Sequence, residues 1–378
     1  MIKKILLFTA VCCALGACAS KTVQVKVTNP ADNTRINEIV ELDLTKTGLK
    51  PKNIVITDAK GMQVPYQFTR ITDKGPQAVI FPAYVGQKQS SLYTLTNGTP
   101  HTFDAQTFGR HIPERKDDFA WENDKAAYRM YGPALAGENP SNGVDLWLKR
   151  TEKLIVNKFY KEELEDGLSY HIDRGQGLDC YKVGHTLGAG GVAPYYKNKL
   201  WVGNHYDTFK VLENGPLRTT FELTYNNVAV DNKTLKQVIT ISLDAYSNMN
   251  KAVVRYDGPI ASMQLAPGIY LHDKVDNVKT DKKAGYAAYA ENAVSDAGVP
   301  VGRNYVAVVV PGLKSTLQKD AHVLALADYK TGEDFTYYFG GGWSRWGFPS
   351  DQDWFNYVER YTNNLKNPLQ VEIISQQK

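Results

Sequence analysis

The chain has 378 residues, a formal net charge of +4 and 23 tyrosines. A chain of this length can bury a full hydrophobic core, and one large domain with a small one is expected. Because Lys3 and Lys4 lie in an N-terminal leader, the remainder is near neutral, which argues against a nucleic-acid partner. No later apolar run approaches the roughly 20 residues that cross a membrane as a helix.

Residues 1–18 resemble a lipoprotein signal peptide. Two lysines precede an apolar stretch. The segment closes with LGAC, which resembles a bacterial lipobox, a signal in which the cysteine, here Cys18, is lipidated. The alternative is an ordinary secretory peptide that is cleaved nearby. We expect a lipoprotein held by Cys18 on the periplasmic side of a Gram-negative outer membrane, with no other membrane contact.

Residues 21–98 are predicted to form a small N-terminal β-sandwich domain. Val23, Val25 and Val27 alternate with polar residues, as in a half-buried strand. Short strand-like runs follow near residues 38–44, 53–57, 64–69 and 77–82, with turn residues between them. This part contains no histidine, so we interpret it as structural or interface-forming.

Residues 99–378 are predicted to form a large antiparallel β-sandwich that carries the active site. Further strands are expected at residues 237–243, 305–310, 323–329, 335–339 and 369–374. Helix is sparse. The clearest helix is predicted over residues 351–365, with Ser350 as its cap and Asp353 at the capping-box position, and a second over residues 151–166. The chain is therefore mainly β, a class in which pockets form on a concave sheet face.

The run RKDDFAWENDKAAYRMY at residues 115–131 is the first candidate for binding. If residues 119–131 are extended, Trp121, Asn123 and Arg129 share one face, and Asp124 lies beside them. An aromatic surface, an amide and a guanidinium fit a uronic acid, because arginine binds carboxylates through two hydrogen bonds. The alternative is a surface strand with solvated charges.

Three of the seven histidines, His171, His185 and His205, lie within residues 168–221. Histidine is the side chain best suited to proton transfer near neutral pH. If its segment is extended, His171 shares a face with Asp173, which would orient the imidazole. Any one histidine has a structural role by default, but we interpret the set as catalytic.

Other polar groups accompany these histidines. Asp179 and Tyr181 share a face in an extended segment, and a tyrosine can transfer protons when a nearby cation lowers its pKa. Asn204 precedes His205 in a glycine-containing stretch. Neither CxxC nor HExxH occurs, so no metal or other cofactor is predicted, although a histidine–aspartate pair leaves a metal open.

The run FGGGWSRWGF at residues 339–348 is the third candidate. Its glycines indicate a mobile or tightly turned loop. We expect Trp343 and Arg345 to be exposed, as a stacking surface for sugars and a second carboxylate-binding group. For Trp346, a packed corner is an equal alternative.

Four motifs together resemble one family. They are RKDDFAWENDKAAYRMYGPAL, SNGVDLWLKR, YHIDRGQGLDCYKVGHTLGAGG and NHYDTFKVLENGPLRTTFELTY. These motifs are similar to the domain of unknown function 4861 family, over most of residues 20–375. The resemblance implies a galactose-mutarotase-like supersandwich, shared with several polysaccharide lyases, in lipid-anchored proteins of polysaccharide-using Bacteroidetes. It also implies activity on uronic-acid-containing oligosaccharides, and one similar group resembles oligosaccharide dehydratases. The resemblance makes His185 a weaker candidate for the site than His171 and His205.

The leading hypothesis is β-elimination on a uronic-acid oligosaccharide, releasing water or a sugar. The proton beside a carboxylate becomes acidic only when the carboxylate charge is neutralised. Arg129 or Arg345 would neutralise it, with the help of an asparagine. His205 or His171 would take the proton, and Tyr181 or the other histidine would protonate the leaving oxygen.

Two alternatives remain open at the level of the sequence. A glycoside hydrolase on the same scaffold would use acids, with Asp124 and Asp179 as candidates. A non-catalytic glycan-binding lipoprotein would use Trp121 and Trp343 as binding surfaces.

Overall fold

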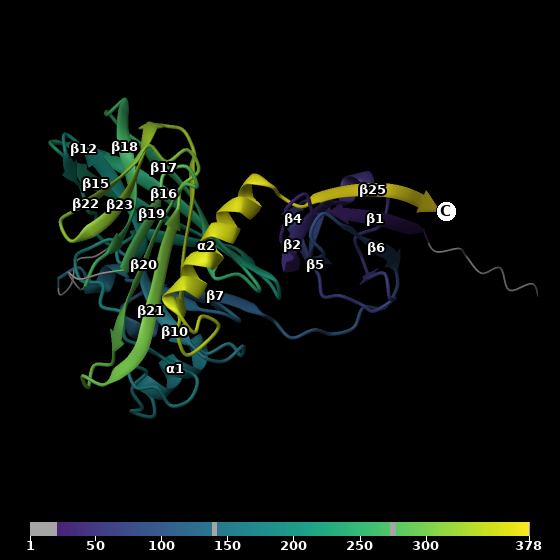
Figure 1. Ribbon diagram of the computed structural model, residues 1–378, viewed down its shortest axis with the longest axis horizontal. Helices are drawn as coiled ribbons and strands as arrows, with labels where there is room; N and C mark the ends of the chain where they lie inside the picture. Colours follow the sequence, from purple (N-terminus) through teal and green to yellow (C-terminus); the bar gives the residue numbers. More distant parts are fainter. Residues whose placement is uncertain (1–20, 138–141, 273–276, 378) are drawn as a thin grey trace, which may run out of the picture.

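The computed structural model describes residues 21–137, 142–272 and 277–377. These residues form a large β module and a small β module joined side by side (Figure 1). Antiparallel sheets make up most of both modules, so the predicted mainly β class is confirmed. Cys18 and the leader lie outside the described residues.

The small module is a sandwich of two sheets. One sheet has the strand order β25-β1-β6-β3 and the other β2-β5-β4. Alternate valines of β1 are fully buried in the core between them, as the sequence predicted. The strands are β1 (Thr22–Thr28), β2 (Arg35–Asp43), β3 (Ile54–Thr57), β4 (Gln67–Thr72), β5 (Gly75–Val85), β6 (Ser90–Asn97) and β25 (Gln370–Gln377).

The strand β25 places the end of the chain in the small module. It pairs antiparallel with β1, from Thr22 opposite Gln377 to Thr28 opposite Gln370. Val371 and Ile373 pack on the small core. The sequence assigned every residue after 98 to the large module. That boundary differs from the structure because alternation identifies a strand but not the partner with which it pairs.

The large module contains three antiparallel sheets. The first has eight strands in the order β14-β15-β16-β17-β24-β21-β20-β19, and two five-stranded sheets have the orders β13-β12-β18-β23-β22 and β11-β10-β9-β8-β7. Side chains from all three sheets meet in the largest apolar core. The strands of the eight-stranded sheet are β14 (Thr208–Asn214), β15 (Arg218–Val230), β16 (Lys233–Asp244), β17 (Met249–Asp257), β19 (Asn277–Asp281), β20 (Tyr286–Val294), β21 (Pro300–Val309) and β24 (Phe335–Trp343).

The smaller sheets complete this module. The strands of one are β12 (Ala189–Tyr196), β13 (Lys199–Leu200), β18 (Ser262–Tyr270), β22 (Ser315–Lys319) and β23 (His322–Lys330). Those of the other are β7 (Thr107–Ile112), β8 (Asp118–Asn123), β9 (Ala127–Met130), β10 (Asp145–Lys149) and β11 (Gly177–Asp179). This last sheet carries the candidate site, because it is buried on both faces and yet contains many ionisable residues.

Two α-helices occur among the described residues, close to the predicted positions. Helix α2 (Asp351–Lys366) has the predicted capping box between Ser350 and Asp353. Trp354 and Val358 bury its apolar side against the eight-stranded sheet. Figure 1 shows α2 leading from the large module to β25 in the small one. In the part of the chain that the structure describes, neither helix is long and apolar enough to span a membrane.

Helix α1 (Val156–Leu164) is shorter than predicted. Its first turn is held by the buried carboxylate of Glu122, which accepts hydrogen bonds from the amides of Ile155 and Val156. A carboxylate there satisfies amides that have no partner within the helix. Glu122 also forms a buried ion pair of 2.7 Å with Lys149, so α1 is fixed to the sheet below it.

Deleting β25 tests whether the C-terminal strand is part of the small fold. A chain that ends after Pro368 leaves one edge of β1 unpaired and uncovers part of the small core. We expect the β1 amides to lose most of their protection in hydrogen–deuterium exchange, while the β16 and β17 amides keep theirs. The control Glu372→Gln removes only an exposed ion pair with Lys26. Unchanged β1 protection in the truncated chain would contradict this role.

Candidate active site

The register of one sheet brings the candidate site together. Arg129 of β9 lies directly opposite Asp145 of β10, and Trp147 of β10 lies opposite Asp179 of β11. Side chains that are opposite or two residues apart on neighbouring strands share a face. The two carboxylates therefore lie on the same face as the Arg129 guanidinium.

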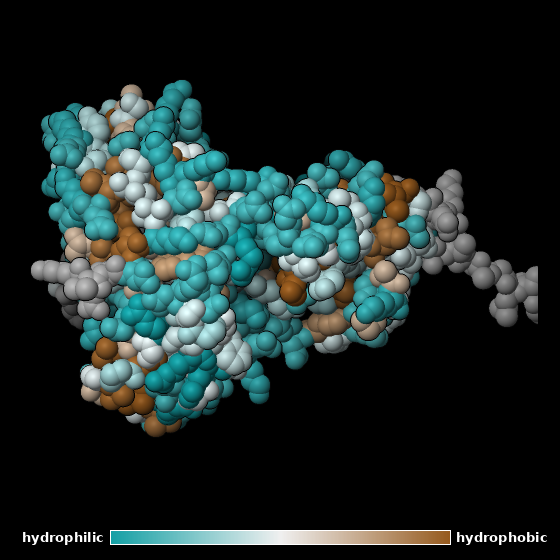
Figure 2. All heavy atoms as spheres, viewed as in Figure 1, coloured by the Kyte–Doolittle hydropathy of each residue, from teal (hydrophilic) through white to brown (hydrophobic). Residues whose placement is uncertain are grey.

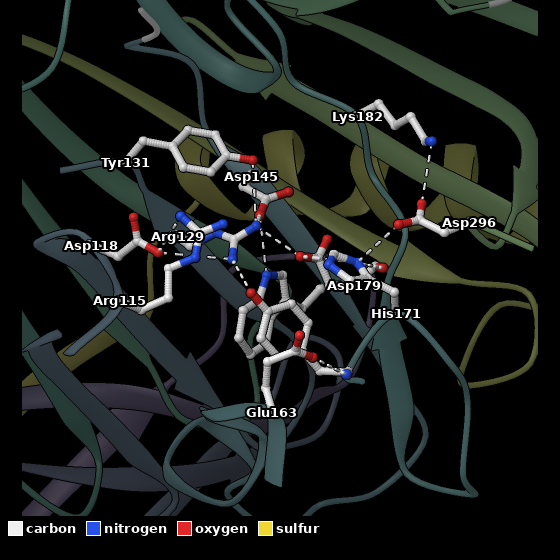
Figure 3. A network of polar contacts seen from close by, with 12 residues as sticks. Arg115, Asp118, Arg129, Tyr131, Asp145, Glu163, His171, Asp179, Lys182 and Asp296 are labelled. Atoms are coloured by element: carbon white, nitrogen blue, oxygen red, sulfur yellow. Dashed lines mark hydrogen bonds and ion pairs between the residues drawn. The ribbon is translucent and has the colours of Figure 1, made fainter. Parts of the chain in front are cut away.

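Arg129 is the centre of this site (Figure 3). It is almost completely buried, and its Nη2 lies 2.6 Å from Asp145 Oδ2 and 2.7 Å from Asp179 Oδ2. A third carboxylate, that of Asp118, lies 3.9 Å from Nη1. Aromatic rings surround the guanidinium at 4.8 to 5.8 Å, which further stabilises the cation. These rings belong to Tyr131, Trp147 and Tyr170.

Negative charge exceeds positive charge in this cluster. Arg129 and Arg115 face the carboxylates of Asp118, Asp145 and Asp179, all of them buried. Burial and the neighbouring Asp145 raise the pKa of Asp179 to about 7. Burial likewise raises the pKa of Asp118 to about 6, against the effect of the two arginines. Strongly perturbed carboxyl groups of this kind are typical of functional sites.

His171 connects the buried cluster to the surface. Its Nδ1 lies 2.8 Å from the main-chain oxygen of Asp179 and 3.7 Å from that residue's Oδ2. The ring remains 31 % exposed. No described residue contacts Nε2 through a hydrogen bond or an ion pair, so this nitrogen is available to a ligand. The sequence predicted that Asp173 orients the imidazole; that was wrong, because the segment turns and Asp179 performs this role.

Further charged side chains lie near His171 in space or in sequence. Asp296 lies 3.7 Å from His171 Nδ1 and 3.2 Å from the ammonium group of Lys182, which is largely exposed. The carboxylate of Asp173, two residues further along the chain than His171, pairs with Arg150 at 3.1 Å and, more weakly, with Arg345 at 3.8 Å. Lys182 is thus linked to the His171 imidazole through Asp296.

The predicted binding face of β8 is wrong. Trp121 is fully buried in the large core and donates from Nε1 to Asn250. Asn123 holds the turn that follows β8 by accepting the amides of Lys125 and Ala126. The strand β8 lies between β7 and β9 in a sheet that is covered on both faces. Its side chains point alternately to these two faces, and both faces are buried.

Asp124 is also structural. It is buried and accepts the main-chain amide of Tyr246 at 2.7 Å. Its second oxygen pairs with Lys125 at 2.7 Å. Asp124 therefore joins the turn after β8 to the end of β16, and it is not part of the Arg129 cluster.

The glycine-rich run at residues 339–348 is not a mobile binding loop. Its first half is the end of β24, and Trp343 is buried there, with its Nε1 donating to the carbonyl of Val301. Arg345 is exposed, as predicted, and its guanidinium lies over the Trp343 ring at 5.5 Å. The glycines are required for packing: a β-carbon on Gly340 would lie 1.9 Å from the carbonyl oxygen of Asn248.

Tyr181 does not fit the predicted role of a tyrosine with a lowered pKa. It is buried in the large core, and burial, with Glu291 nearby, raises its pKa well above the ordinary value. Strand β11 ends at Asp179, so the alternation that would place Tyr181 on the same face stops there. Its ring stands edge-on to His272, a histidine that the sequence did not indicate, at 4.8 Å.

The other predicted residues lie apart from His171. His205 is buried in the segment between β13 and β14, and none of the hydrogen bonds or ion pairs of His171 involves it. Asn204 and His185 are exposed. Among the described residues, His171 and His205 are therefore not linked directly. Among the described ranges, no group of three or more histidine, cysteine or acidic side chains could hold a metal ion.

Several residues of the cluster were missed from the sequence. Asp118 and Asp145 were within motifs that were singled out, but no role was given to either. Asp145 and Trp147 are two residues apart on β10, so their side chains share a face. That spacing could have indicated that Asp145 lies beside a buried aromatic ring. No local pattern indicated Asp296, which reaches His171 from a distant part of the chain, or Lys182, which pairs with Asp296.

Comparison with known proteins shows to which family the chain belongs. A model of the family described as a domain of unknown function, DUF4861, matches residues 27–371. The chain belongs to this family. A curated relative from Formosa agariphila, called uncharacterized protein P7, is 30 % identical over 303 residues, which cover 76 % of this chain and 75 % of the relative.

Two solved structures from Enterococcus faecalis resemble the fold distantly. A protein in glycosyl hydrolase family 38 gives a TM-score of 0.48 with 8 % identity, and an alpha-mannosidase gives 0.47 with 9 %. Each comparison covers 94 % of this chain but only 47 % and 46 % of the other chain, so this chain spans about half the length of either. A likeness of this degree indicates neither a shared activity nor a shared site.

Replacing Arg129 tests the cluster as a unit. The change Arg129→Ala leaves the buried carboxylates of Asp145 and Asp179 without their cation. Removing one partner of a buried ion pair costs about 3–5 kcal/mol, and we expect a loss of that size in the free energy of unfolding by urea. The control Arg255→Ala removes an arginine from an exposed ion pair and should have a far smaller effect. Equal losses for the two variants would contradict the central role of Arg129.

The raised pKa of Asp179 predicts how stability changes with pH. The folded state holds this proton more tightly than the unfolded state, in which the pKa is about 3.9. The stabilisation is complete below about pH 4 and is lost as the pH rises through about 7. In Asp179→Asn, which cannot titrate, we expect a smaller fall in unfolding free energy between pH 5 and 8. The exposed control Asp104→Asn should keep the full slope, and an unchanged slope in Asp179→Asn would refute the assignment.

Proposed function

We propose that the protein is an enzyme that acts on uronic-acid-containing oligosaccharides by β-elimination, with His171 as the proton-transferring residue. The observation that carries this proposal is the placement of His171: its Nδ1 is fixed on the carbonyl of Asp179, while the ring is accessible from outside. A half-exposed imidazole above a buried cluster of perturbed carboxyl groups is a suitable proton acceptor.

The hydrogen bond to Asp179 supports the role of His171 as a base. A carbonyl oxygen only accepts, so Nδ1 carries the proton of the neutral ring and Nε2 has a free lone pair. When Nε2 takes a proton, the imidazolium lies 3.7 Å from the Asp179 carboxylate and 3.7 Å from that of Asp296. The Asp296 carboxylate stabilises the charge that forms during the reaction, and Asp179 does so in its ionised form, above about pH 7.

The basic residues beside His171 fit the substrate class. Lys182 and Arg345 are exposed enough to reach a ligand. Lys182 pairs with Asp296 at 3.2 Å, and Arg345 lies 3.8 Å from Asp173. A bound uronate would place its carboxylate among these cations. Neutralising that charge makes the proton on C5 more acidic, which the elimination requires.

The chemical step breaks two bonds. His171 Nε2 takes the proton from C5, the C5–H electron pair forms the C4–C5 double bond, and the bond from C4 to its oxygen breaks. The leaving oxygen takes up a proton and departs as water or as the hydroxyl of a sugar. When both groups leave from the same side of the ring, the imidazolium can return the proton to that oxygen.

A glycoside hydrolase remains the second candidate because of Asp179. A carboxyl group with a pKa of about 7 is protonated often enough near neutral pH to serve as a general acid. Against this role, Asp179 is 2 % exposed and is already bound to Arg129. The glycan-binding alternative has less support, because both predicted stacking surfaces, Trp121 and Trp343, are buried.

The cellular setting is part of the same proposal. The lipobox-like sequence at residues 1–18 supports an anchor through Cys18 on the periplasmic side of the outer membrane. An enzyme held there would meet oligosaccharides that have already crossed that membrane.

The change His171→Ala tests the proposed reaction. With a panel of uronic-acid oligosaccharides, we expect the parent chain to increase ultraviolet absorbance as the double bond forms. Loss of a positioned proton acceptor lowers rates by roughly 10²–10⁴-fold, and the variant should fall within that range. Product mass should change by one water for a dehydratase, or reveal chain cleavage for a lyase.

The control is His185→Ala, because His185 is an exposed histidine 14 residues further on that lies outside the site. It should retain full activity, and circular dichroism should show both variants folded. Cleavage without new absorbance would favour the hydrolase. Full turnover by His171→Ala would refute the assignment of the base.

A further inference from the structure

A cavity lies where the two modules meet, and His171 is not among its lining residues. Its volume is about 590 Å³, inside the range of roughly 300–1,000 Å³ that is common for small-molecule sites. Three parts of the chain form its walls: the start of β2 with the residues just before it, the strands β16, β17 and β24, and helix α2. Figure 2 shows largely hydrophilic residues over this junction.

The sheet wall of this cavity is a row of three polar residues. Ser242 of β16 lies directly opposite Lys251 of β17, which lies directly opposite Tyr338 of β24. Residues in direct register project from the same face of a sheet. The row therefore presents a hydroxyl, an ammonium group and an aromatic ring on neighbouring strands.

Helix α2 supplies the facing wall. Tyr357 and Tyr361 are one turn apart, and Arg360 lies beside them, so all three line the cavity. The Tyr361 ring stands edge-on to Tyr338 of the sheet, with ring centres 5.7 Å apart. Tyr357 and Tyr361 have centres 6.3 Å apart. Together these tyrosines give the cavity an aromatic lining with polar edges, which suits the apolar faces and hydroxyl groups of sugar rings.

The charges of the lining favour an anion. Arg218 is paired with Asp244, and Arg35 with Glu38, so these four groups compensate one another. Lys251 and Arg360 also line the cavity, and neither side chain forms a hydrogen bond or an ion pair with any residue that the structure describes.

A hydrogen-bond acceptor without a partner lies in the same place. Asn364 lines the cavity, and its buried Oδ1 has no hydrogen-bond partner among the described residues. Buried polar atoms are normally satisfied, so a ligand hydroxyl is a suitable donor to this atom. Hydroxyl groups, aromatic faces and uncompensated cations together point to a charged sugar.

Contacts between the modules fix the walls of the cavity in place. The buried Arg35 of β2 donates to the carbonyl of Asn367 at the end of α2, at 2.5 Å. On the opposite side, Gln67 of β4 accepts the amide of Leu217 at 2.9 Å and donates to the carbonyl of Arg218 at 3.1 Å. A cavity with fixed walls can bind a ligand with little loss of conformational entropy.

We propose that this interdomain cavity is a second carbohydrate-binding site that takes an anionic sugar unit of a glycan. The tyrosines contact the sugar ring, and Lys251 with Arg360 binds its carboxylate or sulfate group. The site binds and does not catalyse, and it would hold a longer glycan while another part of that chain is processed elsewhere. The inference rests on the cavity alone and does not depend on the reaction proposed at His171.

Calorimetry on the full chain without its leader tests this site. The probes are trigalacturonate, a sulfated disaccharide without a carboxylate, and neutral maltotriose. All titrations are made in the His171→Ala background, so that turnover does not disturb the heats. We expect the background protein to bind at least one anionic probe and to bind maltotriose much more weakly. The preferred probe identifies the anionic group.

The decisive variant is Lys251→Gln with Arg360→Gln, which keeps the size of both side chains. Loss of two charge-assisted hydrogen bonds should weaken binding of the preferred anionic probe about tenfold or more. The matched control Lys233→Gln with Arg255→Gln removes the same two charges from the far ends of β16 and β17, and its affinity should stay within about twofold. Equal affinity in the two double variants, or no binding of either anionic probe by the background protein, would overturn the proposal.

Turnover separates this site from the one at His171. With His171 restored, the Lys251→Gln/Arg360→Gln variant should keep the turnover of short substrates that the parent shows, because neither residue contacts the proposed reaction site. If the parent shows no turnover but the anionic probe binds in the cavity, the reaction is refuted and the second site stands.

Discussion

The ion pairs of the buried Arg129 are the constraint on which this part of the molecule depends. One nitrogen of its guanidinium lies within 2.7 Å of both Asp145 and Asp179, and aromatic rings close around it. Burying so many charges is costly unless each finds a partner. The strands β9, β10 and β11 must therefore keep one register, because a shift by one residue would turn a carboxylate away from the arginine.

That buried arrangement also determines what the surface above it can do. Because Asp179 is buried and lies beside Asp145, its pKa is raised to about 7, and its main-chain oxygen orients His171. The histidine is the point at which the cluster meets the outside. Asp296 reaches this point from a distant part of the chain and joins it to Lys182, so the site is assembled only when the large module is complete.

The two modules are more closely linked than their sequence order suggests. The chain begins in the small sandwich, forms the large module, and returns through α2 to add β25 beside β1. The return places α2 across the junction, where Arg35 binds its last turn. The interdomain cavity is a consequence of this path, because one wall comes from each module and the third comes from the connecting helix.

The sequence by itself determined the local features. Alternation at Val23, Val25 and Val27 predicted a strand, and the Ser350–Asp353 capping box fixed the start of α2, since both depend on neighbours within a few residues. Four motifs indicated the family. The prediction that Arg129 binds a substrate carboxylate was wrong, because Arg129 is buried and already paired with Asp145 and Asp179.

Only the tertiary structure decided which faces are exposed and which residues meet. Alternation cannot reveal that the β8 sheet is covered on both sides, so Trp121 and Asn123 were predicted to lie at a surface. Residue type does not distinguish a tryptophan that packs in a core from one that stacks on a sugar. Trp343 was therefore predicted to be exposed, although it is buried. Asp296, which lies near His171, and β25, which pairs with β1, come from distant parts of the chain, and such pairings depend on the packing of the whole fold.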